Sequence, residues 1–83
     1  MERLLRLPLV LRLEPEGGYT VTSPLLPELV TGGDTVQEAL ANVEDALDAV
    51  IELYEDRGRP LPQSLQLPAN GDPIWFEALV ATT

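Results

Sequence analysis

The residues best placed to do chemistry in this 83-residue chain are carboxylates. Four acids recur at every fourth position between residues 44 and 56, and two more lie beside them. In a helix this spacing puts them on one face, where each pair of like-charged neighbours costs about 0.2–0.5 kcal/mol. Such a face is either simply solvated or a docking surface for a cationic partner. We call it the acidic face, and it comprises Glu44, Asp45, Asp48, Glu52, Glu55 and Asp56.

Catalysis by these residues is not expected. Carboxylate pairs can hold a divalent metal, but such sites gather acids from several elements inside a concave surface rather than along one exposed helix. The chain has neither cysteine nor histidine, so thiolate chemistry and the usual general base are absent. The hydroxyls of Ser23 and Ser64 have no histidine or lysine to activate them. We therefore expect no enzyme activity, no cofactor and no metal.

The overall charge limits the possible partners. Fourteen acids oppose five basic residues, which gives a net charge of −9. This disfavours nucleic acids and anionic membranes and favours a cationic partner. The first thirteen residues are interrupted by Arg6 and Arg12, so they form neither a signal peptide nor a membrane segment. A cytoplasmic protein is expected.

A long amphipathic helix is predicted from Val36 to Arg57, and it carries the acidic face. Thr35 followed by Glu38 has the spacing of a capping box, while Gly58 and then Pro60 mark the end of the helix. Apolar residues spaced by three or four form a stripe opposite the acids. This stripe comprises Val36, Ala39, Leu40, Val43, Leu47, Val50, Ile51 and Tyr54, of which Leu40, Val43, Leu47 and Val50 are expected to be buried.

Three strands are predicted before this helix. Leucine at every odd position of Leu5–Leu13 indicates a half-buried first strand, which Pro8 limits to pairing over Leu9–Glu14. Residues 14–18, with one proline and two glycines, should form a hairpin loop. The second and third strands are expected at Tyr19–Ser23 and near Leu29–Thr31.

A fourth strand is predicted after the helix, at Ile74–Ala81. The preceding segment, Arg59–Pro73, contains four prolines and should cross the surface in an extended form, held by Leu61, Leu65 and Leu67. The fourth strand is apolar on both faces except at Glu77, so the helix and a second subunit should cover it. Its expected oligomer interface is Ile74, Trp75, Phe76 and Leu79.

Together these elements predict an α+β fold: a single domain over residues 1–83, with a four-stranded, mainly antiparallel sheet (β-β-β-α-β) and one long helix on one face. One helix covers only one face of a sheet, whereas the strands carry apolar residues on both. We therefore expect a homodimer or a larger assembly.

An ordered series of short motifs resembles the HicB-like antitoxins. The similarity covers about Leu9 to Pro62, and its order and spacing match throughout. The motifs are Gly17-Gly18-Tyr19-Thr20-Val21, Ser23-Pro24-Leu25-Leu26-Pro27-Glu28, Thr31 with Gly33-Asp34-Thr35, and Glu38-Ala39-Leu40 with Asn42.

The resemblance implies a partial ribonuclease-H-like fold with strand order 3-2-1-4. It also implies a binding protein that neutralises HicA, a small basic toxin that cleaves messenger RNA. Many family members carry a DNA-binding domain after the fourth strand, whereas this sequence ends at Thr83, so no direct DNA binding is expected. Glu28 stands where many members have glycine. The alternative is an orphan homo-oligomeric module with a structural or regulatory role and no toxin.

Overall fold

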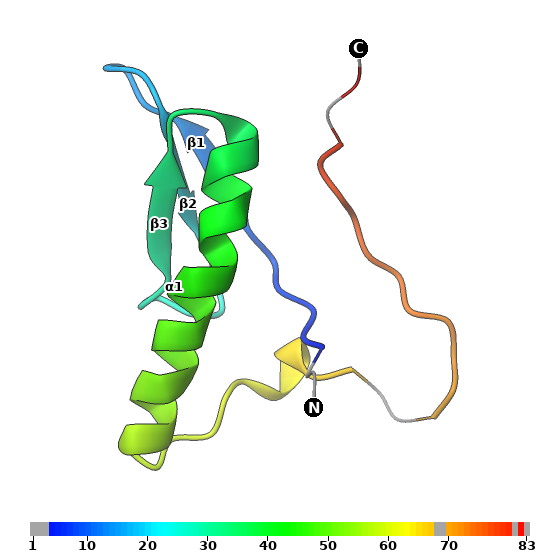
Figure 1. The fold of residues 1–83 in the computed structure, drawn as a ribbon. Coiled ribbons are helices and arrows are strands. Elements are labelled where there is room, and N and C mark those ends of the chain that lie inside the picture. Colours follow the sequence, from blue (N-terminus) through cyan, green and yellow to red (C-terminus); the bar gives the residue numbers. More distant parts are fainter. Residues whose placement is uncertain (1–3, 68–69, 81, 83) are drawn as a thin grey trace.

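The computed structural model describes residues 4–67, 70–80 and 82 (Figure 1). Its elements follow the order β1 (Val10–Leu13), β2 (Tyr19–Thr22), β3 (Val30–Gly33), α1 (Val36–Asp56) and the short 3₁₀ helix η1 (Gln63–Leu65). The α+β class and the single long helix are confirmed. The described residues form three strands rather than the four that we expected.

The sheet is an antiparallel meander with β2 in the centre. Leu11 pairs with Val21, and Val21 pairs in turn with Thr31, so these three residues lie on one face of the sheet. The hairpin between β1 and β2 closes through the Glu14 amide, which donates to the Gly18 carbonyl across 3.0 Å. The predicted order 3-2-1 is therefore confirmed. Within the described residues β1 remains an edge strand.

The predicted start of the helix at Val36 is confirmed, and the helix ends at Asp56, one residue before the predicted Arg57. The Thr35 hydroxyl accepts a hydrogen bond from the Glu38 amide at 3.0 Å, which satisfies one of the donors left open by the first turn. Gly58 has a φ of +64°, the left-handed conformation that ends helices, and the Arg59 amide donates back to the Tyr54 carbonyl.

The helix is much longer than the strands that it covers. Twenty-one residues span about 31 Å in a helix, whereas four residues span about 13 Å in a strand. The sheet therefore supports only the first half of α1, where Val21, Ala39 and Val43 form a small buried cluster. The second half packs against the bend before β3 and the segment after the helix. This larger cluster comprises Leu26, Leu29, Val50, Tyr54, Leu61 and Leu65.

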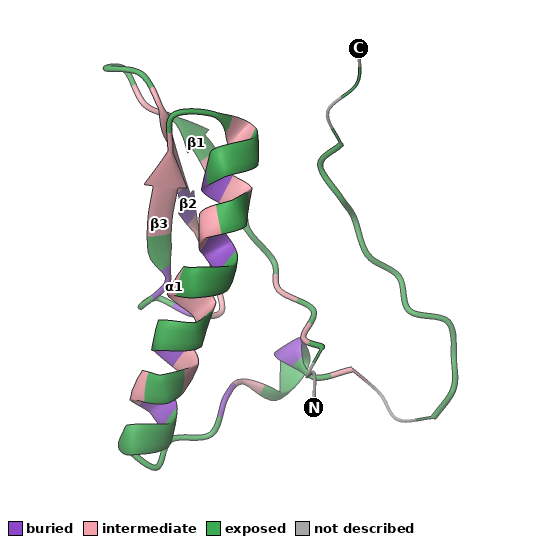
Figure 2. Ribbon diagram, viewed as in Figure 1, coloured by how far each residue is buried: buried purple, intermediate pink, exposed green. Residues whose placement is uncertain are grey.

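The C-terminal segment corrects the sequence-based prediction. Residues 74–80 form no strand and are exposed, while Ala81, the last residue of the predicted strand, lies outside the described residues (Figure 2). The radius of gyration is 14.1 Å, against about 12 Å for a compact chain of this length. A strand needs a neighbouring strand to satisfy its backbone, and residues 74–80 stand apart from β1 in the single chain (Figure 1).

The segment between α1 and residue 74 is also more ordered than expected. It was predicted to be wholly extended, but Gln63–Leu65 form a 3₁₀ turn. Leu61 and Leu65 are buried and hold the segment against α1, as predicted, and Leu67 is half-buried. Pro68, which belongs to the same predicted crossing, lies outside the described residues.

Two of the four helix residues that were expected to be buried are only half-buried. Val43 and Val50 are buried, but Leu40 and Leu47 are not. The reason is that α1 lies over β2 and β3 rather than over β1 (Figure 1). The side of the helix that carries Leu40 and Leu47 therefore faces an open groove instead of a sheet.

Candidate partner-binding surfaces

The acidic face lies on the side of α1 that points away from the sheet. All six of its residues are exposed (Figure 2). They occupy helical positions spaced by three or four, so their carboxylates project from one continuous strip. The structure thus brings together on one element all the residues that the sequence assigned to partner binding.

A side-chain hydrogen bond joins α1 to the sheet, and it comes from a residue for which the sequence predicted no structural role. Asn42, on the flank of α1 that faces β3, donates from Nδ2 to the Gly32 carbonyl across 2.8 Å. Gly32 must be glycine, because a Cβ there would collide with the Tyr19 carbonyl oxygen. The asparagine therefore ties the first half of the helix to β3 and, together with the two apolar clusters, orients α1 on the sheet.

Little positive charge offsets the strip. The last turn of α1 carries no basic residue, although the negative end of the helix dipole lies there. The described residues form one ion pair, between Arg59 Nη1 and Glu28 Oε2, which lie 3.5 Å apart. This pair includes no residue of the acidic face. The strip thus presents charge of one sign to an approaching molecule.

The described residues contain no group of three or more acids placed to hold a metal ion together. The acids of α1 diverge from a convex surface, which suits long-range attraction better than coordination. No helix in the described part of the chain is long and apolar enough to cross a membrane.

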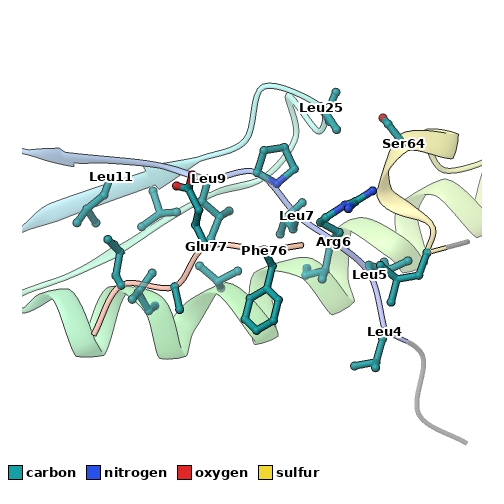
Figure 3. Close-up of a pocket in the computed structure, with 18 residues that line it drawn as sticks. Leu4, Leu5, Arg6, Leu7, Leu9, Leu11, Leu25, Ser64, Phe76 and Glu77 are labelled. Atoms are coloured by element: carbon teal, nitrogen blue, oxygen red, sulfur yellow. The ribbon is translucent and has the colours of Figure 1, made fainter. Parts of the chain in front are cut away.

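A second surface is an apolar groove beside β1, which we call the leucine groove. Its volume is about 1210 Å³. One wall carries Leu7, Leu9 and Leu11 from the N-terminal segment and β1, and the floor includes Leu40 and Leu47 of α1. The other wall is the C-terminal segment, from which Phe76, Glu77, Ala78 and Leu79 line the cavity (Figure 3).

The four residues predicted to form an oligomer interface lie in or next to this groove. All four are exposed in the single chain: Ile74 by 45%, Trp75 by 83%, Phe76 by 76% and Leu79 by 62%. The leucine alternation was predicted to be a half-buried strand; only Val10–Leu13 form the strand, and Leu7, Leu9 and Leu11 line the groove. The sequence did not show that the groove stays open, because that depends on where the C-terminal segment lies.

No family model matches the chain. HicB antitoxin of Escherichia coli K12 is 40% identical over 73 residues, which cover 88% of this chain and 51% of that protein. Antitoxin HicB 1 of Photorhabdus laumondii is 41% identical over 58 residues, or 70% of this chain and 37% of that protein. The chain thus spans about half the length, or less, of these two relatives.

A shorter relative is covered more fully. A UPF0150 protein of Thermoplasma acidophilum is 33% identical over 54 residues, which make up 65% of this chain and 78% of that protein. At this identity and coverage, the similarity includes most of the relative's chain rather than one local motif.

Proposed function

Because the chain belongs to the HicB-like antitoxin family, we propose that it is a binding protein that sequesters a small, basic toxin of the HicA type. The observation that carries the proposal is the acidic face: six exposed acids on one rigid helix, with no basic residue in its last turn. The HicB relatives are named antitoxins, and binding of a basic toxin is proposed here for this chain on the strength of that charge pattern.

The charge acts chiefly on the rate of association. An exposed charge pair adds only about 0–1 kcal/mol of affinity, but a face of one sign steers an oppositely charged protein and raises the association rate at low salt. Apolar contacts must then supply most of the binding energy. The proposed role is that of a non-catalytic inhibitor acting in the cytoplasm.

The test is binding kinetics against a basic protein encoded beside this gene. Replacing Asp48 and Glu52 by Asn and Gln should slow association and flatten its dependence on salt. A matched control, Glu16→Gln with Asp72→Asn, changes the net charge equally at exposed sites away from α1 and should have a smaller effect. Equal rates for the native chain and the α1 variant would show that the acidic face is only a solvated surface.

A second candidate is an orphan homo-oligomeric module without a toxin. It is favoured by the exposed apolar side chains of residues 74–80, which a protein in water usually covers. Self-association is compatible with both candidates. It would also supply a fourth strand beside β1, as in the ribonuclease-H-like arrangement. The absence of any basic neighbour that binds would favour this second candidate.

A further inference from the structure

The structure leaves two complementary strand edges unpaired. β1 is an edge strand in the described part of the chain, so the backbone groups on its outer side have no neighbouring strand, and its Leu11 lines the leucine groove. Residues 74–80 are extended and also have no strand partner. An exposed edge and an exposed apolar segment are each a template for adding a strand.

The connection to the C-terminal segment is anchored beside the N-terminal segment and not beside β1. The Arg6 amide donates to the Leu65 carbonyl across 2.8 Å, and Leu5 forms an isolated antiparallel bridge with Gln66. Beyond this anchor, Arg6 Nη1 donates to the Trp75 carbonyl at 3.3 Å in an exposed position. In the described part of the chain this exposed side-chain hydrogen bond and the groove-lining residues Phe76 and Leu79 hold the segment, and an exposed hydrogen bond is easily released.

The composition of residues 57–73, which connect α1 to the C-terminal segment, favours an extended chain over one that folds back tightly on its own sheet. Four prolines, at positions 60, 62, 68 and 73, lie between α1 and the segment, and proline-rich chains are stiff and extended. In the single chain the large side chains of the segment remain in water while the groove beside them stays open (Figure 3). A second copy can satisfy both surfaces with the same contacts.

We infer that two copies exchange their C-terminal segments, so that Ile74–Val80 of each copy adds as a fourth strand to the free edge of β1 in the other. This inference rests on the self-association that both candidates under the proposed function allow, and it specifies the structure of that assembly. Each sheet is then completed by its partner's strand, and the leucine groove of each copy receives the partner's apolar side chains. The exchange is reciprocal, which gives a closed two-fold dimer.

The area available suits a stable dimer. A buried aromatic residue contributes about 150–250 Å², so Trp75 and Phe76 from two copies supply about 600–1,000 Å². Their exposures of 83% and 76% show that most of this area is free in the single chain. Stable interfaces bury about 1,600 Å² in total, and Ile74, Leu79 and the leucines of the groove can provide the remainder.

The single tryptophan of the chain reports on this exchange. The emission of Trp75 in the native protein should shift to the blue as protein concentration rises, in step with the mass measured by light scattering. A red, solvent-exposed emission at every concentration would overturn the inference. A blue emission that does not depend on concentration would overturn it too, because the segment would then fold back on its own chain.

Cross-linking distinguishes exchange from other dimers, and the chain has no cysteine of its own. Chains carrying Val10→Cys on β1 are mixed with chains carrying Ala78→Cys and treated with a short bis-maleimide. A covalent heterodimer is expected. The control replaces Val10→Cys by Val30→Cys, an exposed position on the opposite edge of the sheet, and should give little product. Equal yields from the two mixtures would overturn the inference.

The outcome is separable from toxin binding. The Trp75→Ser/Phe76→Ser variant should remain monomeric while it keeps the acidic face. The Asp48→Asn/Glu52→Gln variant should dimerise normally while it associates slowly with the basic partner. If the native chain is a monomer, the exchange is refuted whatever the toxin result; if it dimerises but binds no basic protein, the toxin proposal alone fails.

Discussion

The Tyr54 hydroxyl donates a hydrogen bond to Glu28 Oε1 across 2.8 Å and so joins the last turn of α1 to the bend before β3. Arg59 completes the arrangement: its guanidinium lies 4.5 Å from the centre of the Tyr54 ring, and its Nη1 lies 3.5 Å from Glu28 Oε2. Glu28 thus meets two residues at least 26 positions further along the chain, and the three close the end of the helix over the larger apolar cluster. Glu28, which the sequence analysis noted only as a departure from the family pattern, has a structural role.

This contact predicts a defined pH window of stability. The pKa of Glu28 lies below its ordinary value of 4.5, first through a hydrogen bond from its own backbone amide and next through Tyr54. The stability that it contributes is present above pH 4.5 and is lost as the pH falls through the lowered pKa. The bond to Glu28 raises the pKa of Tyr54 above 10.0, so this contribution is lost as the pH rises from 10 through the raised value.

Chemical denaturation at a series of pH values measures this window. Glu28→Gln should be less stable than the native chain at pH 7, and the two stabilities should converge at acidic pH. Glu16→Gln, which alters an exposed acid of the hairpin loop, should follow the native curve. If the difference between native and Glu28→Gln stayed constant below pH 4.5, the carboxylate of Glu28 would not contribute in the way described.

Two leucines give a matched test of packing. Leu26 is completely buried in the larger cluster, so Leu26→Ala should cost about 2–5 kcal/mol. Leu47 is half-buried and faces the groove, so Leu47→Ala should cost the dilute monomer less than about 2 kcal/mol. Urea denaturation at low protein concentration measures both. Equal costs would show that the groove is closed in the single chain.

The tie between α1 and β3 can be tested at Asn42. Asn42→Ala leaves the half-buried Gly32 carbonyl without its side-chain donor and should cost about 1 kcal/mol. Gln37→Ala, at an exposed position of the same helix, is the control and should be close to neutral. Thermal unfolding monitored by circular dichroism compares the two variants. A cost no larger than that of the control would mean that apolar packing alone positions the helix.

The acidic face should carry a small cost in stability. Replacing Asp48 and Glu52 by Asn and Gln removes three repulsive i,i+4 pairs and should stabilise the chain by about 1 kcal/mol at low salt. The gain should shrink as salt is added, because exposed charges are screened. Denaturation at two salt concentrations decides this, and a gain independent of salt would have another origin than repulsion.

The helix α1 and the strands β1 and β2 depend on interactions between residues close in sequence, so the sequence alone predicts them. The Thr35 cap, Gly58 and the 3.6-residue apolar period define α1 from within a few residues of each end. Alternation of apolar side chains and the glycine-containing loop likewise locate β1 and β2. The acidic face follows from the helix alone, because residues four apart must share one side of it.

Contacts between residues distant in sequence determined the C-terminal segment, the burial of the helix leucines and the contacts of Glu28. Whether Ile74–Val80 is a strand depends on a neighbouring edge, and the single chain does not bring β1 and this segment into backbone contact. The half-burial of Leu40 and Leu47 also depends on tertiary structure. It arises because α1 lies over β2 and β3 and leaves β1 uncovered. The contacts of Glu28 with Tyr54 and Arg59 join residues 26 or more positions apart, and no local pattern encodes such a distance. Sequence periodicity records which side of an element is apolar, but only the tertiary structure shows which of those sides finds a partner.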